Sequence, residues 1–250
     1  MACLMRVVVV LVIVLLQSEL AYADIGLICT LKGEMEQVKK SMNIEDKVYR
    51  AEREFYKGVL DGIKVILVRS PMGKVNNAIT AQLLASHFNV DMIVSIGFGG
   101  AVDESLKIGD VVFSTNAIQH DFGTVKPYGF IWGRSPEIGE AGEINIESWV
   151  VSKGYRYGTI VSGDQFIASE DKREWLRKKL NALAVDMGAA SIYEVCRQNG
   201  IKCLFIRVIS DSADIEGRVN YNTAAKVEEF RSVDVMREFL KGYRIGARRQ

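Results

Sequence analysis

Proline and histidine are scarce in this 250-residue sequence, with three and two residues, and there are only four cysteines. No proline-rich or low-complexity stretch separates one part of the chain from another, so the sequence indicates one domain. The histidines (His87 and His120) and the cysteines show no metal-ligand spacing, and the cysteines form no disulfide framework. We therefore expect no metal and no cofactor.

The sequence has no excess of charge of one sign, since it contains 32 Lys and Arg residues and 31 Asp and Glu residues. A basic balance would favour nucleic acid or an anionic membrane surface as a partner. Without it, we expect a small-molecule ligand and no nucleic acid. The basic C-terminal stretch KGYRIGARRQ is interpreted as a solvated tail.

The longest apolar run lies at the N-terminus and is short. Ten apolar residues, Val7 to Leu16, follow Arg6 and precede Ala21-Tyr22-Ala23. This pattern is typical of an export signal cleaved after Ala23, whereas a membrane-spanning helix needs about 20 apolar residues. The alternatives are a buried strand or a membrane anchor. We predict a signal peptide over residues 1–23, an exported (periplasmic or secreted) domain over residues 24–250, and no stable membrane span.

The remaining chain alternates between strand-like and helix-like segments, which favours an α/β fold with a largely buried mixed sheet. Continuous apolar runs predict strands and one-faced apolar spacing predicts helices. The strands are expected over 24–31, 47–60, 63–70, 90–97, 109–118, 156–163, 182–187 and 202–210. The helices are expected over 32–42, 71–88, 172–180 and 188–200, with a last helix that carries Val227, Phe230, Val233, Met236 and Leu240. We interpret the cluster Gly97–Gly100 as a turn, segment 47–60 as half of a hairpin with 63–70, and residues 121–160 mainly as a loop region.

Polar residues gather where the predicted strands end, which is where ligands bind in α/β sheets. A charged residue inside an apolar strand, such as Arg207, must be paired or must line a polar cleft. Asp211, directly after that strand, has capping of the next turn as its simplest role. The cluster GFGGAV lacks the spacings GxxxxGK[ST] and GxGxxG, so it is not read as a nucleotide-phosphate loop.

Several of these segments occur together in the order and spacing of one family. They are DIGLICTLKGEME, SPMGKVNNAITAQLL, VDMIVSIGFGGAVDESLKIGDVVFS, YGTIVSGDQFI, AVDMGAASIYEVC and FIRVISDSAD. From about Asp24 to Leu240, the sequence resembles the 5′-methylthioadenosine/S-adenosylhomocysteine nucleosidases of the purine nucleoside phosphorylase-like superfamily. The resemblance implies a three-layer α/β/α sandwich with a mixed central sheet. It also implies a homodimer, with segments near His120 and 128–132 close to the partner's pocket.

The same resemblance implies hydrolysis of the bond between adenine and a 5′-thio-substituted ribose. Asp211 would protonate the departing base, Glu34 would activate the water, and Arg207 would lie beside that water and the ribose. A carboxyl with an ordinary pKa near 3.9 needs burial or hydrogen bonding to stay protonated for that task. The other residues implied for the substrate pocket are Phe166 and Ile167 around the purine, Met72 and Met187 against the sugar, and Gly99 and Ser210.

Two positions depart from the family pattern. Gly188 occupies the place of a glutamate that holds the ribose 2′- and 3′-hydroxyls, and Phe98 replaces a small residue. The glycine is also an ordinary helix-entry residue, and Phe98 could be a core side chain. With Asp211, Glu34 and Arg207 retained, we interpret the changes as altered specificity, for example for a bulkier, 2′-substituted or deoxy sugar.

The sequence therefore predicts a purine nucleosidase. Phosphorolysis is the competing reaction in this superfamily, but CTLKGE does not resemble the phosphate loop of the phosphorylases, and phosphate needs several donors. The alternative function is a nucleoside- or carbohydrate-binding protein on the same scaffold with weak or no turnover.

Overall fold

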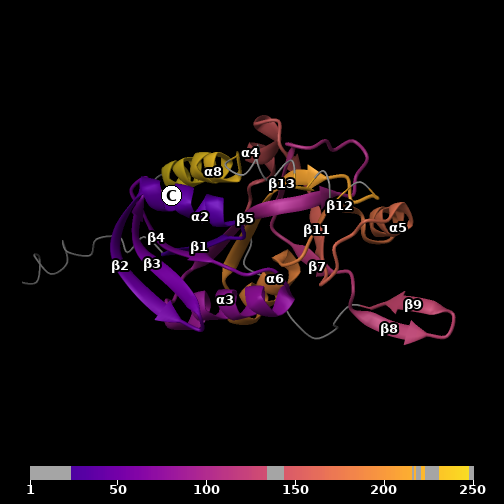
Figure 1. Ribbon diagram of the computed structural model, residues 1–250. Helices are drawn as coiled ribbons and strands as arrows, with labels where there is room; N and C mark the ends of the chain where they lie inside the picture. The colour runs from indigo at the N-terminus through magenta and orange to yellow at the C-terminus, as the bar shows by residue number, and fades with distance from the viewer. Residues whose placement is uncertain (1–23, 134–143, 216, 218–220, 223–230, 248–250) are drawn as a thin grey trace, which may run out of the picture.

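The computed structural model describes residues 24–133, 144–215, 217, 221–222 and 231–247 (Figure 1). Their main feature is a mixed β-sheet. Its strands are, in spatial order, β10 (Arg156–Tyr157), β6 (Val111–Ser114), β13 (Lys202–Asp211), β5 (Met92–Ala101), β1 (Ile25–Cys29), β4 (Ile63–Arg69), β3 (Arg53–Leu60) and β2 (Met42–Arg50). Strands β4, β1, β5 and β13 are parallel neighbours. Strand β3 runs antiparallel to both β4 and β2, and β6 runs antiparallel to β13 but parallel to β10.

The sheet branches at the carboxyl end of β5. There Gly100 and Ala101 pair with the antiparallel strand β12 (Ala182–Asp186). Strand β12 in turn pairs with β11 (Thr159–Ser162), and β11 pairs with β7 (Ala117–Gln119). Strand β13 continues to pair with β5 as far as Asp211. The ends of β12 and β13 therefore meet at the end of β5.

Helices cover both faces of the sheet (Figure 1). Helices α3 (Lys74–His87) and α6 (Ala189–Asn199) pack together on one face, and α2 (Lys32–Ser41), α8 (Arg231–Ala247) and α4 (Glu147–Ser152) lie on the other. Each face has its own apolar core, and α5 (Glu170–Leu180) packs with a third cluster near β11 and β12. This arrangement confirms the predicted three-layer α/β/α fold.

Local sequence signals explain several elements. Strands β1 and β5 are buried at every position, as expected for parallel strands covered on both faces. Helix α5 begins at Ser169, whose hydroxyl accepts a hydrogen bond from Lys172 N, and helix α6 ends at Gly200 with a φ of 65°.

The glycine cluster of residues 97–100 is part of β5, so its interpretation as a turn was wrong. Its glycines allow close contacts instead. A Cβ at Gly97 would lie 2.1 Å from Thr30 Oγ1, and one at Gly100 would lie 2.8 Å from Asp211 Oδ1. The missing side chains let two polar residues of other elements approach the strand.

Three predicted strands are each divided in two in the structure. Segment 47–60 is split by a turn at Ala51-Glu52, both with positive φ, so β2 and β3 form a hairpin of their own. Segments 109–118 and 156–163 are each two strands, interrupted near Asn116 and at Gly158. The predicted loop region contains a separate hairpin of β8 (Gly123–Lys126) and β9 (Gly129–Trp132), as well as α4 and β10.

Some predictions cannot be compared with this structure. The signal peptide over residues 1–23 and the apolar positions Val227 and Phe230 lie outside the described residues. In the part that is described, no helix combines the length and apolar character needed to cross a bilayer.

Candidate active site

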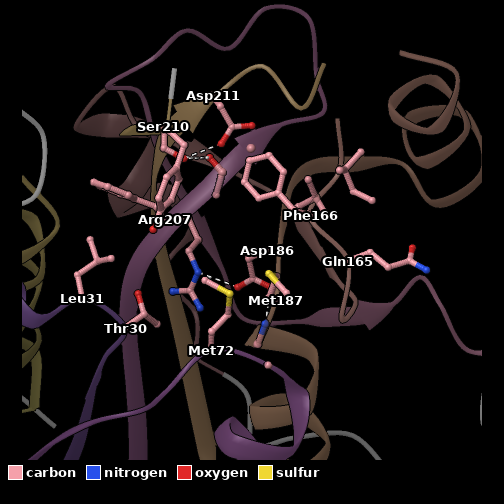
Figure 2. Close-up of a pocket in the computed structure, with 18 of the residues that line it drawn as sticks. Thr30, Leu31, Met72, Gln165, Phe166, Asp186, Met187, Arg207, Ser210 and Asp211 are labelled. Carbon is pink, nitrogen blue, oxygen red and sulfur yellow. Dashed lines mark hydrogen bonds and ion pairs between the residues drawn. The ribbon is translucent and has the colours of Figure 1, made fainter. Parts of the chain in front are cut away.

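A cavity of about 500 Å³ opens where β5, β12 and β13 end (Figure 2). Ten of the eleven site residues predicted from the sequence line it. They are Met72, Phe98, Gly99, Phe166, Ile167, Met187, Gly188, Arg207, Ser210 and Asp211. Glu34, the eleventh, is fully buried and does not belong to the lining.

Asp211 ends strand β13 at the wall of this cavity and is only 3% exposed. Ser210 Oγ donates a hydrogen bond to its Oδ2 (2.8 Å), and Ala213 N donates to its Oδ1 (2.9 Å). Burial raises the pKa of Asp211 above its ordinary value, although these two hydrogen bonds oppose the shift. Asp211 is therefore a carboxyl group that holds its proton to higher pH than an exposed aspartic acid.

Arg207 is held in place by a buried ion pair with Asp186 of β12. Its Nε lies 2.8 Å from Asp186 Oδ2, and its Nη1 and Nη2 donate to Ser95 O (2.8 Å) and Ser95 Oγ (3.1 Å). Figure 2 shows the guanidinium next to Asp186 and Met72. The arginine is thus paired and also lies in the wall of the cavity, which accounts for a charged residue inside an apolar strand.

Glu34 lies in the first turn of α2, and its carboxylate faces the start of its own helix. Its Oε2 accepts hydrogen bonds from Thr30 N (3.1 Å) and Leu31 N (3.0 Å), and its Oε1 accepts one from Ser232 Oγ of α8 (2.5 Å). Burial raises its pKa to about 7, although these hydrogen bonds and the charge of Arg207 act in the opposite direction. Thr30 and Leu31, whose N–H groups bind the carboxylate, line the cavity, whereas Glu34 itself does not.

Three aromatic rings form one wall of the cavity. Tyr221 lies edge-on to Phe98 (ring centroids 5.9 Å apart) and to Phe166 (6.1 Å). Phe98 also belongs to the apolar core under α2 and α8, so it is both a core side chain and a cavity side chain. The wall suits a flat, largely apolar ligand group such as a purine.

Gly188 precedes α6 and faces the side chain of Asn77 on α3. A Cβ at Gly188 would lie 2.5 Å from Asn77 Nδ2, so the space beside this glycine is occupied by the asparagine amide. Asn77 also lines the cavity.

Sequence reasoning missed other lining residues. Asn77 lies in a predicted helix, and Tyr221 and Asn222 lie where no element was predicted. Asp186 also lines the cavity, but the sequence assigned it no role. His120, which stood near the implied partner pocket, is buried outside this lining, and burial lowers its pKa to about 4. Among the described residues, no group of three or more His, Cys, Asp or Glu could hold a metal ion.

A mixed, branched sheet with an acid, an arginine and an aromatic wall at its strand ends defines a nucleoside-processing enzyme fold, and the comparisons with known proteins agree. The model of the phosphorylase superfamily matches residues 24–239. The chain is 34% identical over 206 residues to the 5′-methylthioadenosine/S-adenosylhomocysteine nucleosidase of Staphylococcus aureus (strain bovine RF122 / ET3-1), which covers 79% of this chain and 90% of the relative.

Solved structures show the same fold. The nucleosidase of the same name from Neisseria meningitidis, in complex with methylthio-immucillin-A, superposes with a TM-score of 0.79 at 28% identity, over 88% of this chain and 99% of that one. Futalosine hydrolase of Helicobacter pylori gives a TM-score of 0.74 at 28% identity, over 88% and 96%. This chain belongs to the 5′-methylthioadenosine/S-adenosylhomocysteine nucleosidase family of the phosphorylase superfamily.

Proposed function

We propose that this protein hydrolyses the N-glycosidic bond of a purine nucleoside, with 5′-methylthioadenosine- or S-adenosylhomocysteine-like nucleosides or a variant sugar as substrates. The observation that carries the proposal is the position of Asp211. Its buried carboxyl has a raised pKa and lies in the same cavity as the ring of Phe166 and the guanidinium of Arg207 (Figure 2). A proton donor beside an aromatic face is what departure of a purine base requires.

The reaction balances with the groups at hand. The bond between sugar C1′ and base N9 breaks and its electron pair leaves with the base, whose N7 receives the proton of Asp211. The oxygen of a water molecule forms the new bond to C1′, and Glu34 accepts the proton that the water releases. A general acid or base in such a step contributes about 10²- to 10⁴-fold in rate.

The pKa of about 7 at Glu34 suits this role, because a general base works best when its pKa lies near the working pH. In the present structure Glu34 is fully buried and bonded to Thr30 and Leu31, which line the cavity. Catalysis by Glu34 therefore requires that the reacting water gain access to this buried carboxylate.

The scarcity of positively charged side chains in the cavity favours hydrolysis over phosphorolysis. Arg207 is the only Lys or Arg among the described lining residues, and its guanidinium already binds Asp186 and Ser95. A phosphate nucleophile needs several donors. Lys32, the other cation near this loop in sequence, is exposed and does not line the cavity.

Base release by the protein from Asp24 onward tests the proposal. The panel contains adenosine, 5′-methylthioadenosine, S-adenosylhomocysteine, inosine and their 2′-deoxy counterparts, and Asp211→Asn is the blank. Release that Asp211→Asn lowers at least 100-fold would support a nucleosidase with this acid. Binding without release from any nucleoside would instead support the second candidate, a binding protein, which the departure at Gly188 favours.

We further propose that the protein is exported and forms a homodimer. The apolar run and the Ala-Tyr-Ala sequence before Asp24 support export, and the family match begins at that same residue. The β8–β9 hairpin supports dimer formation, because it projects from the body of the molecule and exposes Val125 and Tyr128 by about 80% (Figure 1). Apolar side chains this exposed favour burial against a partner.

A further inference from the structure

The side-chain oxygen of Asn77, Oδ1, is a buried acceptor with no hydrogen-bond partner among the described residues. The side chain projects from the first turn of α3, is 3% exposed and lines the cavity. No donor in the described part of the chain reaches its Oδ1. Buried acceptors are nearly always hydrogen-bonded, so an unpaired one in a cavity wall points to a partner in the cavity.

The orientation of this amide is fixed by its other end. Nδ2 donates to Gly73 O (2.9 Å) and to Pro71 O (3.4 Å). Both partners are carbonyl oxygens, which accept hydrogen bonds only from the NH₂ group, so the amide cannot be turned over without placing oxygen against oxygen. The acceptor Oδ1 is therefore the end that remains available.

The nearby donors of α6 are already engaged. Gly188 N and Ala189 N donate to Asp186 Oδ1 (3.1 Å each), and Ala190 N donates to Ser162 Oγ (2.8 Å). The first turn of α6 therefore offers no free N–H to Asn77.

Gly188 makes room for this arrangement. A Cβ there would lie 2.5 Å from Nδ2, 2.7 Å from Cγ and 3.0 Å from Oδ1 of Asn77, which are too close for real contacts. A side chain at position 188 therefore requires the amide of Asn77 to leave its present position.

We propose that Asn77 Oδ1 accepts a hydrogen bond from one sugar hydroxyl of the bound nucleoside, and that Gly188 is the space this amide requires. The inference rests on the proposed function, since it names a residue that selects the sugar of that substrate. A single neutral acceptor binds one hydroxyl. A sugar without that hydroxyl leaves Oδ1 unpaired and is rejected.

The test compares kcat/KM of the wild type and Asn77→Ala for adenosine, 2′-deoxyadenosine and 3′-deoxyadenosine. We expect Asn77→Ala to lower the value for adenosine about 10- to 100-fold and to leave unchanged the value for the analogue that lacks the recognised hydroxyl. An equal effect on all three nucleosides would mean a structural role and would overturn the proposal. Asn76→Ala, in the same helical turn but outside the lining, is the matched control and should not change the ratios.

A second measurement tests the steric conflict between positions 77 and 188. Gly188→Glu should lower the melting temperature in the wild-type background and much less in Asn77→Ala, since the amide that it meets is then absent. Equal losses in both backgrounds would overturn the role assigned to Gly188.

Failure of the proposed function can be told apart from failure of this inference. If the wild type releases no base from any nucleoside, hydrolysis is excluded, and calorimetric binding of the same three nucleosides replaces kcat/KM. A loss of adenosine affinity in Asn77→Ala that one deoxy analogue does not share would still support the inference. Equal affinities for all three nucleosides in both proteins, or no binding of any, would overturn it.

Discussion

Arg207 and Asp186 form an ion pair between two strands that are not paired with each other in the sheet. Strand β13 carries the arginine and β12 the aspartate, and both pair with β5. The second oxygen of Asp186 accepts hydrogen bonds from Gly188 N and Ala189 N at the start of α6. One carboxylate therefore joins the two branches of the sheet and fixes the helix entry beside the cavity.

This ion pair predicts a large loss of stability when its negative charge is removed. Asp186→Asn leaves the Arg207 guanidinium buried without a counter-charge, which costs about 3–5 kcal/mol. Urea unfolding at pH 7 measures the change. Glu36→Gln, which removes the partly exposed pair with Lys39, is the control and should cost less than about 1 kcal/mol. Similar urea midpoints for the two variants would show that the buried pair contributes no more to the free energy of unfolding than the partly exposed pair.

Glu34 predicts that stability falls as the pH rises through a defined range. Its pKa is raised from 4.5 to about 7 in the folded protein, so the folded state holds a proton that the unfolded state has lost. The stability that this proton provides is complete below pH 4.5 and disappears by about pH 7, a change of roughly 3 kcal/mol. In Glu34→Gln this part of the pH dependence should vanish.

Unfolding free energies of the wild type and Glu34→Gln at pH 4.5, 6 and 7.5 check this expectation. Ser232→Ala, which removes one hydrogen bond to the carboxylate but leaves the titrating group, should keep the pH dependence. If the difference between wild type and Glu34→Gln is the same at all three pH values, Glu34 does not titrate in this range.

Gly97 predicts a steric penalty in the middle of β5. In Gly97→Ala the added methyl would lie 2.1 Å from Thr30 Oγ1, so the side chain of Thr30 must shift, at a cost of about 1–3 kcal/mol. The fall in melting temperature should be smaller when Thr30→Ala is added. Gly133→Ala, whose Cβ would meet only one atom at 3.9 Å, is the control and should have little effect.

The β8–β9 hairpin predicts the oligomeric state. Replacing both Val125 and Tyr128 with lysine removes the most exposed apolar groups of the hairpin, and the protein should then elute as a monomer where the wild type elutes as a dimer. Light scattering coupled to size-exclusion chromatography gives the masses. Tyr49→Lys, on the far edge strand β2, controls for the added charge. A dimer that survives the double change would place the interface elsewhere.

The layers and most helices could be predicted from the sequence, because apolar periodicity reports burial directly. The glycines of β5 could not, since the sequence alone does not distinguish a glycine that turns the chain from one that another side chain approaches. Thr30, which needs the space at Gly97, is 67 residues away in the sequence.

The cavity was predicted largely by the family resemblance, which placed ten residues in its lining. What it could not provide was the contact between Asn77 and Gly188, because α3 and α6 are adjacent only in the folded protein. The burial of Glu34 and its hydrogen bonds from Thr30 and Leu31 likewise depend on how α2 begins and on where α8 packs.

The hydrogen bond from Ser232 to Glu34 links the end of the chain to its beginning, across 198 positions. During synthesis α8 is made after the other described helices and strands, so the carboxylate of Glu34 acquires this hydrogen bond only once α8 has packed against α2.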